Sequence, residues 1–236
     1  MTAEQPTSTG TPAPAGLRER KKQRTRDALL RAALELFTSQ GYERTTVDEI
    51  VDAVDVSQRT FFRYFASKEE VAFAVQQMVE RHFVTALRER PAHEAPLEAM
   101  RNAVLSAWNT IGEAIMEVVP VEVYLRTFQM IESTPALLAV HLRRSIEMEE
   151  NIARLIADRE GLDVDADPRP RVAVAAFSGV MRITGQLWGR GEDPSLEAMR
   201  TLTETYLDHL GPALAADWRG DADATSWDPP YPPYAP

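Results

Sequence analysis

The sequence predicts an all-α fold of about nine helices, divided into a small N-terminal domain and a larger C-terminal domain. Two observations lead to this prediction. Apolar residues recur at helical spacing through most of residues 25–215, and capping residues, glycines and prolines mark the ends of the segments. No segment alternates apolar and polar residues with the period of two that is typical of a half-buried strand.

The composition excludes several classes of protein and site. The chain has no cysteine, so disulfides, thiolate metal sites and cysteine nucleophiles are excluded. The four histidines are scattered, and no HExxH pair or phosphate-binding glycine loop occurs, so we expect no enzyme, metal site or cofactor. No signal-peptide segment and no run of about 18 apolar residues occurs. We therefore expect a cytoplasmic protein without a membrane partner.

Charge is distributed unevenly along the chain. The net charge is −10, but residues 17–90 contain 14 Lys and Arg against 12 Asp and Glu, whereas residues 91–236 contain 12 against 23. Six of the ten residues at 17–26 are basic. Such a segment beside a nearly neutral domain can neutralise phosphate groups even in an acidic protein. The alternative is a solvated, charged start of the first helix.

The N-terminal third of the chain contains four predicted helices. The first covers residues 25–40 and is followed by a glycine, which favours a helix end. Thr46 opens the second, because a glutamate three residues later completes a capping box. Ser57 caps the third helix, and Ser67 caps a fourth that extends to about residue 90.

The second and third helices, joined by the turn Asp55-Val56, have the pattern of a helix-turn-helix motif. The second helix of such a motif lies in the major groove of DNA, where the edges of the bases can be distinguished. Here that helix carries side chains able to contact DNA, namely Gln58, Arg59, Thr60, Arg63 and Tyr64. The sequence therefore predicts a three-helix, N-terminal DNA-binding domain.

A resemblance to the TetR family of transcriptional regulators covers about residues 20–80 and rests on the segment GYERTTVDEIVDAVDVSQRTFFRYFASKEEV. The part VSxRTFFRYF resembles an actinobacterial-type variant of the family. The resemblance implies that a homodimer binds double-stranded DNA at a palindromic operator. The DNA-binding residues that it implies are Thr46, Ser57, Gln58, Arg59, Thr60, Arg63, Tyr64 and Lys68.

Three positions depart from the usual pattern of the family. Asp55 stands where the turn usually has glycine, and Arg59 replaces the glycine that usually precedes the threonine of the recognition helix. Phe62 replaces a DNA-contacting tyrosine, so only apolar contact remains there. Phe61 and Phe65 are expected to lie in the core. The operator sequence therefore cannot be taken from better-known members of the family.

The C-terminal half contains five further predicted helices, near residues 96–117, 120–132, 135–160, 170–189 and 195–215. The resemblance implies that they form a ligand-binding and dimerisation domain. A pocket between such helices is lined by bulky apolar side chains and a few polar groups. The candidates are Trp108, Tyr124, Arg126, Phe128, Phe177, Met181 and Trp188. The alternative is ordinary core for the apolar candidates and plain surface for Arg126.

The last two helices are the expected dimer surface. Small residues at 173–179 would allow two helices to approach closely. The following helix has an apolar stripe formed by Leu196, Met199, Leu202, Tyr206 and Leu210. A palindromic operator would match the two-fold symmetry of such a dimer.

Four regions are therefore predicted: a disordered tail at 1–16, the DNA-binding domain at 17–70, the ligand-binding and dimerisation domain at 71–217, and a disordered Pro-rich tail at 218–236. We expect a homodimeric repressor that a small, largely apolar ligand releases from its operator. Candidate effectors are an acyl-CoA, which some relatives with the VSxRTFFRYF variant sense, and an aromatic or other lipophilic metabolite. The alternative is a ligand-independent regulator or activator whose C-terminal domain serves dimerisation or a protein partner.

Overall fold

The computed structural model of the chain describes residues 16–193 and 195–215. These residues form ten α-helices and no strand, which confirms the all-α prediction. The helices are α1 (Leu17–Gln40), α2 (Val47–Asp52), α3 (Gln58–Tyr64), α4 (Lys68–Ala72), α5 (Ala74–Arg88), α6 (Pro96–Val118), α7 (Val121–Ser133), α8 (Pro135–Glu160), α9 (Arg169–Arg190) and α10 (Leu196–Ala215). The tail predicted at 218–236 and all but the last residue of the tail predicted at 1–16 lie outside the described residues.

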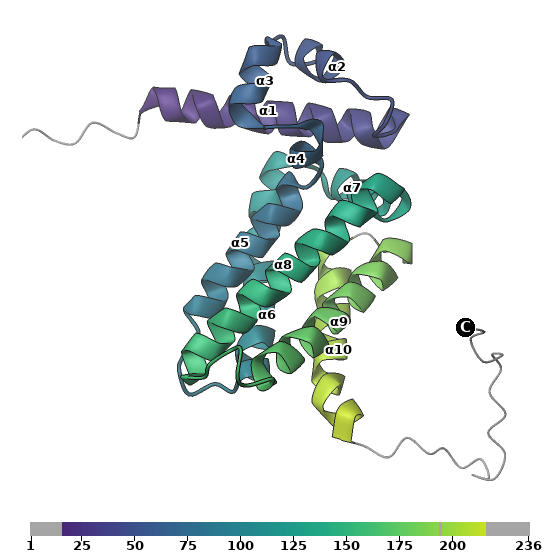
Figure 1. Cartoon of the computed structure of the whole chain (residues 1–236). Coiled ribbons are helices and arrows are strands. Elements are labelled where there is room, and N and C mark those ends of the chain that lie inside the picture. The colour runs from purple at the N-terminus through teal and green to yellow at the C-terminus, as the bar shows by residue number, and fades with distance from the viewer. Residues whose placement is uncertain (1–15, 194, 216–236) are drawn as a thin grey trace, which may run out of the picture.

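The N-terminal helices form a separate layer at one end of the molecule. Figure 1 shows α1 lying across the top of the bundle, with α2 and α3 on its far side. Leu30 of α1, Ile50 of α2 and Phe61 of α3 are fully buried and hold this layer together. Burial of each such side chain stabilises the fold by roughly 1.5–3 kcal/mol. The polar face of α3 is thereby directed away from the bundle.

The first helix begins at Leu17, earlier than the expected start at Thr25. The added turns consist mainly of Arg, Lys, Gln and Glu, which are good helix formers. They contain no apolar stripe, so the helical periodicity that predicted the rest of α1 is absent from them. The basic residues at 18–24 lie exposed on these turns.

The predicted fourth helix is interrupted at Phe73, which separates α4 from α5 and raises the number of helices to ten. The backbone of Phe73 leaves the helical region, with φ −96° and ψ 1°. Its ring is fully buried. Neither proline nor glycine marks this joint, so packing rather than local sequence produces it. The division of domains predicted at residue 70 stays a prediction, and the joint lies close to it.

The remaining helices form a bundle below the N-terminal layer. Helix α5 packs mainly against α6, α9 packs against α8 and α10, and α7 contacts α1, α8 and α9 (Figure 1). Phe128 of α7 lies directly against α9, because a Cβ atom added at Gly189 would lie 3.0 Å from its ring. Glycine at this position therefore sets the distance between α7 and α9.

The stripe predicted on α10 faces largely inward. Met199 is buried, and Leu196 and Leu202 pack half-buried against the same core. Tyr206, in contrast, is 38% exposed. Much of the stripe therefore serves the core of the single chain, because α10 covers α6 and α9, and the part of α10 in a dimer surface stays a prediction.

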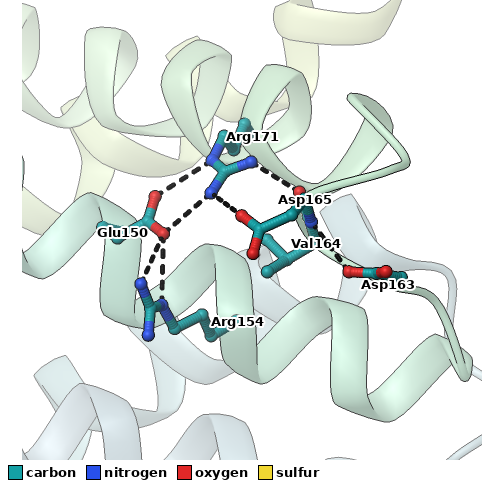
Figure 2. A network of polar contacts seen from close by, with 6 residues as sticks. All are labelled: Glu150, Arg154, Asp163, Val164, Asp165 and Arg171. Carbon is teal, nitrogen blue, oxygen red and sulfur yellow. Dashed lines mark hydrogen bonds and ion pairs between the residues drawn. The ribbon is translucent and has the colours of Figure 1, made fainter.

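Polar networks hold the far end of the bundle. Figure 2 shows Arg171 at the start of α9 bound to Glu150 of α8, with Nε 3.0 Å from Oε2 and Nη2 2.9 Å from Oε1. The same guanidinium contacts Asp165 at 2.9 Å, and Arg154 donates to Glu150 at 3.1 Å. These contacts fix the α8–α9 connection to both helices.

A second network joins the α5–α6 turn to α8. Glu94 is buried and accepts hydrogen bonds from both Arg90 and Asn102. Arg159 of α8 donates to the backbone carbonyl oxygens of Arg90, at 3.0 Å, and Glu94, at 2.9 Å. The hydrogen bonds from Arg90, followed by that from Asn102, lower the pKa of Glu94 from 4.5 to about 2.

The low pKa of Glu94 predicts how stability depends on pH. Because the pKa is lower in the folded chain, the carboxylate stabilises the fold fully above its ordinary pKa of 4.5, and this contribution is lost as the pH falls towards about 2. We expect Glu94→Gln to lower the free energy of unfolding at neutral pH and the difference from wild type to shrink in acid. Urea unfolding over this pH range measures both. Glu35→Gln, at an exposed carboxylate of α1 outside this network, is the control, and a difference independent of pH would contradict the prediction.

Candidate nucleic-acid interface

Helix α2 begins with the predicted capping box, which the structure confirms. The hydroxyl of Thr46 accepts from the backbone N–H of Glu49 at 3.2 Å, and the Glu49 carboxylate accepts from the Thr46 N–H at 2.7 Å. The hydrogen bond from the Thr46 N–H, followed by the one that its hydroxyl donates at 3.0 Å, lowers the pKa of the Glu49 carboxyl. Thr46 is exposed at the N-terminus of α2, where a helix favours anions. Its contact with a phosphate stays a prediction.

The turn between α2 and α3 contains a left-handed residue, Asp55, with φ 53°. Among the described residues it is the only non-glycine residue with positive φ. The turn closes through a hydrogen bond of 3.0 Å from the N–H of Val56 to the carbonyl oxygen of Val51. Aspartate tolerates this conformation better than most residues but less well than glycine. The turn is therefore built as expected, with strain that glycine would avoid.

Helix α3 has one buried and one exposed face. Phe61 and Phe65 lie on its inner face. They are 0% and 1% exposed and belong to the core, as expected. On the outer face, Phe62 is 52% exposed, and Arg59 is exposed without a hydrogen-bond or ion-pair partner among the described residues. The outer face therefore offers one unpaired guanidinium and one apolar ring to a ligand.

Other side chains of α3 are already held by neighbours. Ser57 caps the helix by accepting from the Thr60 N–H at 3.3 Å. The amide of Gln58 donates to Asp48 of α2. Arg63 donates to the hydroxyl of Tyr64 at 3.3 Å, and its guanidinium lies 5.0 Å from the centre of that ring. These contacts orient the side chains, and their predicted roles in DNA binding stay predictions.

Lys68 has a structural role that the sequence did not indicate. Its ammonium donates to the carbonyl oxygens of Tyr42, at 2.8 Å, and Thr45, at 3.0 Å, and lies 4.3 Å from the centre of the Tyr42 ring. It thereby joins the start of α4 to the loop before α2. A third contact, to Glu43 at 3.5 Å, leaves the ammonium no free donor for the predicted phosphate contact in this conformation.

The arrangement described here has counterparts in known proteins. The profile of "Bacterial regulatory proteins, tetR family" matches residues 29–75, and that of the "MftR C-terminal domain" matches residues 94–215. The chain is 48% identical over 214 residues to the HTH-type transcriptional regulator TcmR of Streptomyces glaucescens, covering 91% of this chain and 95% of TcmR. The chain belongs to the TetR family of transcriptional regulators. It is therefore a DNA-binding regulator, and its relatives are regulators rather than enzymes.

Two further comparisons agree with this assignment. MftR of Mycobacterium tuberculosis, a proposed regulator of mycofactocin biosynthesis, is 28% identical, with 75% of this chain and 86% of MftR covered. The crystal structure of NalD, a repressor from Pseudomonas aeruginosa, has a TM-score of 0.53 at 18% identity, with 82% of this chain and 96% of NalD covered. The second comparison supports the TetR fold alone.

The basic turns of α1 add positive charge beside the helix-turn-helix. Arg18, Arg20, Lys21 and Arg24 are exposed, and none forms an ion pair with a described residue. Arg26, one turn further on, lies with its guanidinium 5.1 Å from the centre of the Phe65 ring. The excess of basic residues in the N-terminal region thus lies on the same layer of the molecule as α3 (Figure 1).

The structure brings three of the predicted pocket residues together. Tyr124 and Phe128 of α7 lie 5.7 and 6.1 Å from Trp188 of α9, measured between ring centres. Burial raises the pKa of Tyr124 to about 12. The indole N–H of Trp188 donates to the carbonyl oxygen of Ser195 at 3.0 Å, which gives this tryptophan a structural role.

The other predicted pocket residues lie elsewhere. Phe177 stacks on Phe83 with ring centres 5.6 Å apart, and it lines a separate pocket of about 140 Å³. Met181 packs half-buried on the core. Trp108 is 7% exposed, and its indole N–H has no partner among the described residues. Arg126 is exposed and donates to a carbonyl oxygen of its own helix at 3.2 Å, so the structure does not bring it to the aromatic cluster.

A groove between α5 and α8 was missed by the sequence analysis. It is lined by Arg81 and Arg88 of α5 and by Arg144 of α8. The spacing of seven residues places Arg81 and Arg88 on one face of a helix, but nothing local relates them to Arg144. Within the described part of the chain, no helix is long and apolar enough to cross a bilayer, and no group of three metal-ligating side chains is present.

Substitution of Asp55 tests the conformation of the turn. We expect Asp55→Ala to lower the free energy of unfolding by about 1 kcal/mol, because alanine disfavours positive φ. Asp55→Gly should raise it by up to about 1 kcal/mol relative to wild type. Urea unfolding measures these differences, and Asp55→Asn, which removes the charge but tolerates the conformation, is the control. An alanine variant as stable as the asparagine variant would show that the left-handed conformation costs nothing.

Proposed function

We propose that the protein is a homodimeric repressor that a small, largely apolar molecule releases from a palindromic operator. The observation that carries this proposal is the exposed outer face of α3 with the unpaired Arg59. A guanidinium in this position can bind the O6 and N7 atoms of guanine with two hydrogen bonds. Because the partner is DNA, we expect the protein to work in the cytoplasm.

A stripe on α9 supports dimerisation. Val172, Ile183 and Leu187 are exposed by 64%, 41% and 39%, although each is apolar. Gly179 lies between them in sequence, and a Cβ atom added there would meet nothing within 4 Å. An exposed apolar stripe with a small residue in its middle allows a second helix to approach closely. A two-fold dimer through α9 would present two α3 helices to two half-sites about one turn of DNA apart.

Contacts between α1 and the bundle support control by a ligand. Arg31 of α1 donates to the carbonyl oxygens of Val118, at 2.9 Å, and Glu117, at 3.1 Å, at the C-terminal end of α6. Helix α7, which follows, packs against α1 and carries Tyr124 and Phe128 of the aromatic cluster. A molecule that displaces these rings would move a helix in contact with the DNA-binding layer. The ligand can change the free energy of DNA binding only by as much as it binds one arrangement of the helices more tightly than the other.

The predicted effectors agree with the chemistry of this interior. The aromatic rings of Tyr124, Phe128 and Trp188 favour a ligand with a largely apolar body. A lipophilic metabolite and the acyl chain of an acyl-CoA both satisfy this requirement. Nothing in the described residues favours the alternative, a ligand-independent regulator or activator.

Removal of the Arg59 guanidinium tests the recognition helix. With DNA from upstream of the protein's own gene, we expect Arg59→Ala to weaken binding by about tenfold or more, because a two-pronged contact to guanine contributes roughly 1–3 kcal/mol. Tyr64→Phe should weaken binding several-fold through loss of one phosphate contact. Fluorescence anisotropy measures the affinities, with Arg143→Ala on the exposed surface of α8 as the control. Wild-type affinity in both recognition-helix variants would refute the assignment of α3.

A charge placed on the α9 stripe tests the dimer. We expect Gly179→Arg to fold, because its side chain has room in the single chain, but to be monomeric, because the charge would be buried between two α9 helices. Sedimentation equilibrium measures the mass, and circular dichroism checks the helix content. Asn151→Arg, on an exposed position of α8, is the matched control. A dimeric Gly179→Arg variant would exclude α9 as the interface.

A further inference from the structure

The groove between α5 and α8 is large enough for a small molecule. Its volume is about 570 Å³, within the range of roughly 300–1,000 Å³ that is typical of ligand sites. Val84 and Met148 supply apolar surface, and both are half-buried on the core. The groove thus offers an apolar floor between two long helices that run side by side (Figure 1).

The charged lining of the groove is basic, in contrast to the acidic C-terminal region as a whole. Arg81, Arg88 and Arg144 line it together with a single carboxylate, that of Glu80. The side chains of Arg81 and Arg88 are exposed and make no hydrogen bond or ion pair with a described residue. Burial raises the pKa of Glu80. The three guanidinium groups are therefore incompletely neutralised by the protein.

Arg144 lies in this lining without a close carboxylate partner. Its nearest carboxylate oxygen, on Glu80, is 3.8 Å away. With the Gln77 amide turned so that its oxygen faces the guanidinium, that oxygen lies 3.1 Å from both terminal nitrogen atoms. The Nε atom is buried without a hydrogen-bond partner. A buried donor without a partner costs about 1–3 kcal/mol, so a movement of the Arg144 side chain that brings Nε to an anion would remove this cost.

We infer that this groove binds a small anion with an apolar body, whose carboxylate or phosphate oxygen atoms are received by Arg144, Arg81 and Arg88. The apolar part of the ligand lies along Val84 and Met148. Arginine is suited to both anions because its planar group donates two parallel hydrogen bonds. The inference goes beyond the proposed function, because the groove is separate from the aromatic cluster of α7 and α9, and it rests on that function for its effect on DNA binding.

The position of Arg144 explains how such a ligand would act on DNA binding. Its guanidinium lies 5.4 Å from the centre of the Phe73 ring, over the joint between α4 and α5. Helices α5 and α8 have few close backbone contacts here and are bridged by polar side chains, including Gln76 and His141 at 3.1 Å. An anion that draws Arg144 into the groove changes both the spacing of α5 and α8 and the contact at the joint that leads to α3.

Calorimetric titration of the full-length protein tests the inference with three probes of equal chain length: decanoate, decyl phosphate and decan-1-ol. We expect at least one anion to bind at least about tenfold more tightly than the alcohol, and the tighter anion identifies the preferred head group. Arg144→Gln should weaken that binding by about tenfold or more. Because loss of Arg144 could disturb the fold, the double variant Arg81→Gln/Arg88→Gln provides a second test at exposed positions.

Arg143→Gln, at the neighbouring exposed arginine that does not line the groove, is the matched control and should bind as wild type does. The inference is overturned if neither anion binds, if decan-1-ol binds equally well, or if both groove variants keep wild-type affinity. Operator affinity is measured in parallel with and without the bound anion. Anion binding without any change in operator affinity would refute release by this ligand but leave the site standing. If the protein binds its operator but none of the anions, the anion site is refuted and the proposed DNA-binding function stands.

Discussion

The ammonium group of Lys68 is the contact on which the orientation of the DNA-binding helices depends. It belongs to the first residue of α4, yet its hydrogen bonds go to the backbone of the loop before α2, at Tyr42 and Thr45. Hydrogen bonds to a charged group contribute roughly 1.5–3 kcal/mol each. The loop before α2 therefore cannot move relative to α4 without losing these contacts, which ties the helix-turn-helix to the start of α4.

Two places allow the bundle to act on the N-terminal helices. One is the joint at Phe73, where the chain passes from α4 into α5. The other is the end of α6, whose carbonyl oxygens are bound by Arg31 of α1. The first contact leads into α5 and the second is at the end of α6. A change in the spacing of α5 and α6 would therefore tilt the N-terminal helices rather than shift them. In the proposed dimer, such tilting would change the separation of the two α3 helices, to which binding at two half-sites of a palindromic operator would be sensitive.

The sequence predicted the parts of the interface that depend on neighbouring residues. The capping box at Thr46 and the cap at Ser57 were found because their partners lie within three residues. The joint at Phe73 and the role of Lys68 could not be found in this way. The joint follows from burial of one ring among helices distant in sequence, and the Lys68 contacts go to backbone atoms, which every residue possesses.

The candidate ligand residues show the same limit. Aromatic residues on α7 and α9 were predicted to meet because each helix has a clear apolar face, and Tyr124, Phe128 and Trp188 do lie together. Arg126 was predicted as a polar group of the pocket, but it is exposed on α7. The choice of a polar residue requires knowledge of which helices are neighbours, and that knowledge comes from packing alone.

The energy required for release is compatible with the proposed groove. Moving a two-state equilibrium from 1:99 to 99:1 requires a ligand to prefer one state by about 5.5 kcal/mol. If a dimer has two such grooves, each ligand has to supply about half of this, roughly 3 kcal/mol. One hydrogen-bonded pair between an arginine and an anion contributes roughly 1.5–3 kcal/mol. It reaches the required energy when it forms in the state released from DNA and not in the DNA-bound state. If Arg144, which lies between Glu80 and the Phe73 ring at the α4–α5 joint, bound the anion in only one of the two arrangements, this contact would supply the energy that the proposed release requires.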